Sequence, residues 1–151
     1  MIVIEQLKRD EGFVSHIYKC TSGKDTVGYG YNLEANPLNL SAFELKEVRC
    51  NGVSEAIANL WLLRMVEDIE EKLSNSLEFF ERLSDARKAV LINMAYQMGF
   101  LGLLKFKNTL KYLKRGDYAL VSENMLNSTW AEQTPKRAQR LARQMSTDIP
   151  R

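Results

Sequence analysis

Apolar residues recur at helical spacing over most of the 151-residue chain, but this spacing fails between residues 13 and 31. Before this stretch, Val3, Ile4 and Leu7 follow a helical period up to Gly12, a residue type that commonly ends helices. Within it, residues 17–20 and 25–29 read as two short strands on either side of a polar turn. We therefore expect one β-hairpin among helices, an α+β fold that is mainly α.

Helical periodicity returns after Asn36-Pro37. Ser54 is a suitable N-cap for a helix over 54–73, whose stripe would be Ile57, Leu60, Trp61, Met65 and Ile69. The most apolar segment, 85–98, is expected to be a central buried helix that ends at Gly99. Further helices are expected at about 41–51, 106–114, 118–127 and 135–146.

The predicted helix over 54–73 would be roughly 30 Å long, enough to connect two lobes. We expect one domain over residues 1–151. It would comprise a small N-terminal lobe at about 13–53, a linking helix at about 54–74, and a larger helical lobe at about 75–151 that includes the helix 1–12. No run reaches the roughly 18–20 apolar residues of a membrane span, so stable membrane insertion is not expected. The N-terminus lacks a secretory pattern, which predicts synthesis and folding in a cytosol.

Composition excludes several kinds of site. The chain has one histidine, His16, and two cysteines, so neither a metal cluster nor a disulfide framework is expected, and no cofactor is predicted. Charge is unevenly distributed, because residues 101–151 carry ten Lys or Arg against four Asp or Glu. A polyanionic partner would therefore meet the C-terminal part of the chain.

The candidate catalytic residues of this sequence are Glu11, Cys20 and Thr26. Glu11 lies in the last turn of its predicted helix, where the negative end of the helix dipole and the neighbouring Asp10 both favour a protonated carboxyl group. The hairpin can present Cys20 and Thr26 to one cleft, whereas strand alternation turns Asp25 to the opposite face. A proton donor that faces a polar pair is what glycosidic bond cleavage requires.

The sequence around these residues also resembles that of a known protein family. The spacing Glu-x8-Cys-x5-Thr followed by Gly28-Tyr29-Gly30 resembles the pattern of the phage-type lysozymes (endolysins), which have Glu, then Asp or Cys, then Thr. Residues 89–99 resemble the central helix of that family's C-terminal lobe. Residues 130–138 resemble its W-x-x-Q-T-P-x-R-A segment. The three matches occur in family order between residues 11 and 138.

The resemblance implies hydrolysis of the β-1,4 bond between N-acetylmuramic acid and N-acetylglucosamine in peptidoglycan. Glu11 would be the general acid, and Thr26 would hold the attacking water. Cys20 would act as base, as nucleophile or only as a polar spacer, since an ordinary thiol with a pKa of about 8.5 is mostly neutral at pH 7. The saccharide and peptide cleft would be lined by Tyr96, Gln97, Asn108, Thr109, Asn124 and Arg137.

The resemblance also carries expectations about context. It implies a monomer stored in the host cytoplasm, which reaches the periplasmic cell wall through a separate holin-like pore. Tyr31 stands where relatives often have histidine, and Ser22 and Asn32 are unremarkable replacements in the upper cleft that leave the fine substrate specificity open. The alternatives are a lytic transglycosylase acting on the same bond, an inactive wall-binding relative, and a small basic helical domain that binds nucleic acid. The leading hypothesis predicts no nucleic-acid partner.

Overall fold

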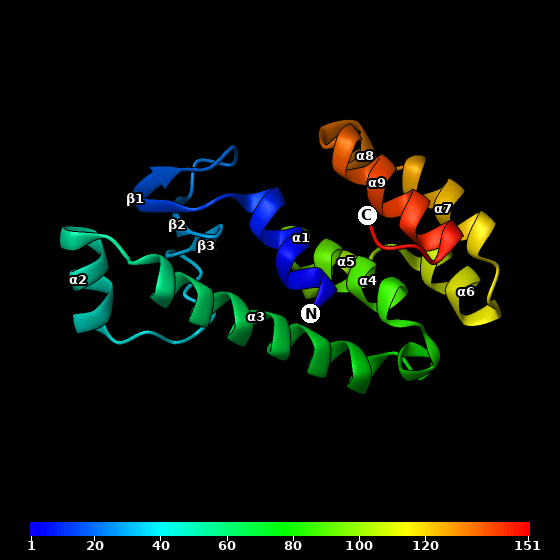
Figure 1. Cartoon of the computed structure of the whole chain (residues 1–151), viewed down its shortest axis with the longest axis horizontal. Coiled ribbons are helices and arrows are strands. Elements are labelled where there is room, and N and C mark those ends of the chain that lie inside the picture. The colour runs from blue at the N-terminus through cyan, green and yellow to red at the C-terminus, as the bar shows by residue number, and fades with distance from the viewer. The chain divides into compact units, whose positions relative to one another are not determined.

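The computed structural model describes all 151 residues and is mainly helical, with one three-stranded antiparallel sheet near the N-terminus (Figure 1). The predicted α+β class is confirmed. The helices are α1 (Ile2–Glu11), α2 (Ala42–Asn51), α3 (Glu55–Ser76), η1 (Phe80–Arg82), α4 (Asp85–Met98), α5 (Phe100–Leu104), α6 (Lys107–Arg115), α7 (Tyr118–Leu126), α8 (Thr129–Gln133) and α9 (Pro135–Thr147). None of them combines the length and hydrophobicity of a membrane-spanning segment.

The chain forms two compact units. The first, here called the hairpin unit, comprises residues 7–68 and contains the sheet. The second, the helical unit, comprises residues 1–6 and 69–151. Both boundaries fall inside helices, so α1 and α3 each contribute residues to both units.

The sheet of the hairpin unit has the order β1 (Val14–Lys19), β2 (Asp25–Gly28) and β3 (Tyr31–Asn32). The predicted hairpin is confirmed, although its first strand begins earlier than expected and β3 was not anticipated. β3 is only two residues long and depends on a tight reversal in which Gly28 and Gly30 take φ values of +68° and +69°. Glycine adopts this left-handed region without the steric penalty that other residues meet.

The long helix α3 has the N-cap that the sequence predicts, because the Ser54 hydroxyl accepts a hydrogen bond from the Ile57 amide at 3.2 Å. Its buried face differs from the expected stripe. Trp61 and Ile69 are buried and Met65 is half-buried, as expected, but Ile57 and Leu60 are exposed. The core-facing positions run instead through Leu62 and others on the adjacent side of the helix.

Helix α4 is the buried centre of the helical unit, as its sequence predicts. Six of its apolar residues are almost inaccessible to solvent: Ala89, Val90, Leu91, Ile92, Met94 and Ala95. The helix ends at Gly99 and packs against α5 and α9, while α7 lies against α6, α8 and α9 (Figure 1). The short elements α5, α8 and η1 were not predicted, because five residues or fewer show no helical period.

Candidate active site

Glu11 is the last residue of α1, and its carboxylate lies directly over the backbone of Gly30. A Cβ atom placed on Gly30 would be 2.7 Å from Oε2 of Glu11 and 3.2 Å from its Cδ. Gly30 belongs to the turn between β2 and β3. The absence of a side chain at position 30 therefore makes the space in which the carboxylate rests beside the sheet.

Cys20 follows β1 directly and closes the hairpin turn, since its amide donates to the Lys24 carbonyl at 3.0 Å. Its sulfur lies 3.1 Å from the Ser22 hydroxyl. Hydrogen bonds from the Ser22 hydroxyl, then the Lys24 backbone, then the Thr26 hydroxyl lower the pKa of the Cys20 thiol to about 7. The Cys20 thiol is therefore more acidic than an ordinary thiol, and the Ser22 hydroxyl is the largest cause.

Thr26 lies in β2 with only 3% of its surface exposed. Its hydroxyl donates to the Lys24 carbonyl at 2.9 Å. Because a hydroxyl carries one proton, Thr26 donates either to this carbonyl or to the Cys20 thiolate, and in the first case its oxygen remains an acceptor.

Asp25 faces away from Thr26, as strand alternation predicts. Its carboxylate pairs with Lys19 at 2.5 Å and with Arg49 of α2 at 2.9 Å. Lys19 and then Arg49 lower the pKa of the Asp25 carboxyl group by hydrogen bonding to its charged form. The Asp25 carboxylate is therefore engaged with two cationic side chains of the hairpin unit.

The hairpin unit brings Glu11 and Cys20 together around one side chain, Tyr18 of β1. Burial, and then the negative charges of Glu11 and Cys20, raise the pKa of the Tyr18 phenol above its ordinary value. Thr26 is the cross-strand partner of Tyr18. The three residues that the sequence singles out for catalysis therefore meet on one side of the sheet.

In the helical unit, three of the six predicted substrate-binding residues line one cavity of about 660 Å³. They are Asn108 and Thr109 of α6 and Asn124 of α7. Lys105 and Lys107 also line it, and no carboxylate does. This lining suits a ligand that is rich in hydrogen-bonding groups and is neutral or anionic.

The other three predicted residues lie outside this lining. The carbonyl oxygen of the Gln97 side chain accepts a hydrogen bond from the indole nitrogen of Trp130 at 2.8 Å, and Trp130 does line the cavity. The guanidinium Nε of Arg137 donates to the Asn93 side-chain oxygen at 2.9 Å. Tyr96 is half-buried at the end of α4.

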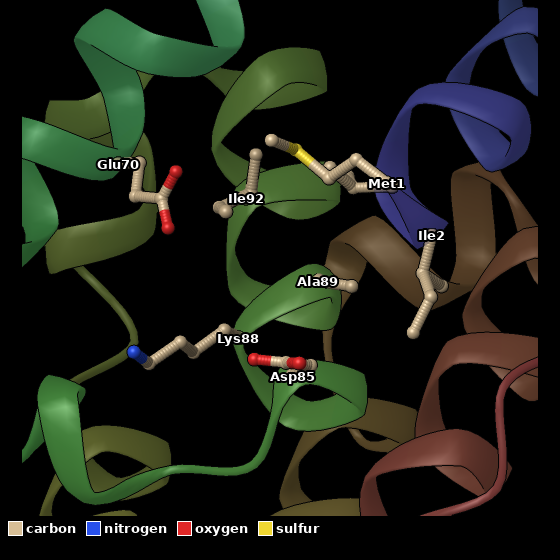
Figure 2. Close-up of a pocket in the computed structure, with 8 residues that line it drawn as sticks. Met1, Ile2, Glu70, Asp85, Lys88, Ala89 and Ile92 are labelled. Atoms are coloured by element: carbon tan, nitrogen blue, oxygen red, sulfur yellow. The ribbon is translucent and has the colours of Figure 1, made fainter.

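A second cavity of the helical unit, about 410 Å³, contains none of the predicted residues. Figure 2 shows Met1 and Ile2 on one side and the charged groups of Glu70 and Lys88 on the other. Nowhere in the chain do three or more His, Cys, Asp or Glu side chains gather in a way that could hold a metal ion. Both cysteines are free.

Comparison with known proteins gives consistent matches over nearly the full length. The family model described as phage lysozyme matches residues 8–146. Probable T4-type lysozyme 2 of Dictyostelium discoideum is 32% identical over 151 aligned residues, covering 91% of this chain and 89% of that protein. Probable T4-type lysozyme 1 of the same organism is 32% identical over 152 aligned residues, with the same two coverages.

The chain belongs to the phage lysozyme family. The suspected resemblance is confirmed, and the protein is a glycoside hydrolase with a lysozyme-like, peptidoglycan-degrading function. A further relative is the pre-baseplate central spike protein Gp5 of Enterobacteria phage T4. It is 28% identical over 154 aligned residues, which cover 93% of this chain and 27% of Gp5. The aligned region is therefore a minor part of Gp5.

Sequence reasoning gave no role to several residues that the structure places beside the predicted site residues. Ser22 and Tyr18 lie close to Cys20. In the helical unit, Asn93 is the partner of Arg137, 44 positions away in sequence. The hairpin periodicity would have placed Tyr18 on the face of Cys20, but no sequence signal pairs Asn93 with Arg137.

Proposed function

We propose that this enzyme is an endolysin that hydrolyses the β-1,4 bond between N-acetylmuramic acid and N-acetylglucosamine, with Glu11, Cys20 and Thr26 as its catalytic residues. The observation that carries the proposal is the grouping of a carboxylate with a thiol whose pKa is about 7 on one side of the sheet. A base is most effective when its pKa lies near the operating pH. Family membership favours this function over the nucleic-acid-binding alternative.

In the proposed reaction, protonated Glu11 donates its proton to the glycosidic oxygen as the bond from that oxygen to C1 of the muramic sugar breaks. The Cys20 thiolate accepts a proton from water, and the water oxygen forms the new bond to C1. Thr26 orients the water through its hydroxyl oxygen. The thiol then loses its proton and the Glu11 carboxylate regains one, which restores the starting state.

A base is a better role for Cys20 than a covalent nucleophile. A neutral thioether sulfur accepts protons weakly, so a bond between C1 and sulfur would be a poor intermediate for a second displacement. Direct attack by water on the face opposite the leaving group inverts the anomeric carbon. The proposal therefore predicts an inverted reducing end rather than a retained one.

The cavity of the helical unit is proposed to bind the sugars or the peptide stems of the substrate. Asn108, Thr109 and Asn124 would hydrogen bond these groups. Gln97 uses its side-chain oxygen for Trp130, which leaves its amide N–H groups to donate to an acetamido carbonyl. Tyr96 would lie against a sugar ring, and Arg137, aligned by Asn93, would meet a carboxylate of a peptide stem.

The test is digestion of purified peptidoglycan, with product analysis by mass spectrometry and anomer analysis by NMR. Wild type should release reducing muramic ends, whereas 1,6-anhydro ends would identify a lytic transglycosylase instead. Glu11→Gln should abolish release without unfolding, and Glu34→Gln, at an exposed carboxylate of the same unit, should retain it. Unchanged release by Glu11→Gln would remove Glu11 from the reaction. Cys20→Ala should lose most activity and Cys20→Asp should keep much of it.

The endolysin role has a separate test. We propose that the enzyme is a monomer that accumulates in the host cytoplasm and depends on a separate holin-like pore. Cells that express it should keep their turbidity until chloroform permeabilises the membrane, and then lyse. Lysis without permeabilisation would contradict the dependence on a pore, and light scattering of the purified enzyme checks the monomer.

A further inference from the structure

Tyr18 occupies a place on the sheet that the proposed roles of Glu11, Cys20 and Thr26 leave unexplained. The Cα register of β1 and β2 puts Tyr18 directly opposite Thr26. Side chains that are directly opposite in an antiparallel pair project from the same face, about 5 Å apart at their Cβ atoms. Cys20 is two residues beyond Tyr18 and lies on that face as well.

The hydroxyl group of Tyr18 has no hydrogen-bond partner within the protein, although the residue is half-buried. The other two tyrosines around the sheet are different. The Tyr29 hydroxyl donates to Glu55 at 2.8 Å, and the Tyr31 hydroxyl donates to Asn36 at 2.9 Å. Tyrosine hydroxyls in partly buried places usually have a hydrogen-bond partner. The Tyr18 hydroxyl is therefore available to bond a ligand.

The Tyr18 phenol is in its neutral, donating form at neutral pH, because its ordinary pKa is near 10 and its surroundings raise it further. Burial is the largest cause of its raised pKa, followed by the charges of Glu11 and Cys20. The phenol therefore remains protonated at neutral pH, beside a carboxylate and a thiol. Thr26 already commits its single proton to the Lys24 carbonyl or to the thiolate. Tyr18 is thus the uncommitted hydroxyl donor beside these reacting groups.

We propose that Tyr18 is a further catalytic residue, whose hydroxyl donates a hydrogen bond to an oxygen of the sugar that carries the attacked anomeric carbon. The proposal rests on the proposed function, because it assigns the sugar oxygen as the missing partner. Hydrogen bonds to this sugar strengthen as its ring distorts toward the transition state. The contribution of Tyr18 should therefore lie mainly in kcat rather than in KM.

The test compares Tyr18→Phe with Tyr31→Phe, since each removes one hydroxyl from the same unit. Tyr18→Phe should lower kcat about tenfold with little change in KM and no loss of Tm, because no bond within the protein is lost. Tyr31→Phe should lower Tm and leave kcat unchanged, because its hydroxyl is bonded to Asn36. Kinetics are measured on soluble peptidoglycan fragments by release of reducing ends, with Glu11→Gln as the zero reference.

Two results would overturn the proposal: a kcat of Tyr18→Phe within twofold of wild type, or a loss of activity that merely follows a loss of Tm. These results differ from a failure of the proposed function. In that case wild type itself would release no reducing ends, and the comparison between variants would show no activity at all. Activity in wild type with an unaltered Tyr18→Phe would refute the role of Tyr18 alone.

Discussion

The Glu11 carboxylate lies against the backbone of Gly30, so Gly30→Ala is a sensitive test of the proposed general acid. The added Cβ would be 2.7 Å from the carboxylate oxygen, against about 3.4 Å for ordinary van der Waals contact. The carboxylate must therefore move by about 0.7 Å, the difference between the two distances. Because it is the far end of a flexible side chain, it can move with little effect on the fold.

The two consequences of Gly30→Ala differ in size. Placing alanine at the φ of +69° costs about 1–2 kcal/mol, partly offset by the lower entropy of the unfolded chain. For a chain of this length this lowers Tm by roughly 2–4 °C. A misplacement of about 1 Å in a catalytic group can reduce the rate about 100-fold, so a shift of this size should reduce kcat roughly 10- to 100-fold.

The assay is reducing-end release at 25 °C, where the variant remains folded, together with Tm from calorimetry. Gly116→Ala is the matched control, since Gly116 has a φ of +75° and a Cβ there would meet nothing within 4 Å. It should show a similar loss of Tm and full activity. If Gly30→Ala retains the activity of Gly116→Ala, the position of the Glu11 carboxylate does not matter to the reaction, and the reasoning fails.

Three other variants test the rest of the site and the core. Ser22→Ala removes the main hydrogen bond that stabilises the Cys20 thiolate, so the thiol pKa should rise from about 7, and both iodoacetamide alkylation and the acid limb of the activity profile should move to higher pH. Asp25→Asn should retain near wild-type kcat and hardly change the midpoint of urea unfolding, because exposed ion pairs contribute little; inactivity would make this carboxylate catalytic. Gln144→Ala should lose about 2–4 kcal/mol on urea unfolding, since this fully buried amide bonds Gln6, the Ala86 carbonyl and the Arg151 amide; a loss below 1 kcal/mol would contradict this.

Local sequence patterns determined the elements whose signal is long or chemically distinctive. The continuous apolar run of α4 can only be satisfied by burial on all sides, and the failure of the helical period after Gly12 leaves the hairpin as the alternative. Strand alternation also separated Asp25 from Thr26 correctly. The same reasoning did not find β3, because two residues contain no period and their pairing depends on the glycine turn before them.

The sequence alone did not predict which side chains contact each other, and the reason is different. Whether Ile57 or Leu62 of α3 is buried depends on which face other elements cover, since both are equally apolar. Arg137 meets Asn93, and Trp130 meets Gln97, across separations of 44 and 33 residues. Such contacts arise only when the helices pack, so no local pattern encodes them.

The three proposed catalytic residues illustrate the same division. The spacing of Glu11, Cys20 and Thr26, with the family pattern around it, was enough to predict the reaction class, which family membership confirms, and to propose the three residues. Only the folded chain decided that the turn brings the Ser22 hydroxyl and the Lys24 amide to the sulfur, which lowers the pKa of the thiol to about 7. A residue type is set by the gene, but its acidity is set by the hydrogen-bond donors that the fold brings to it.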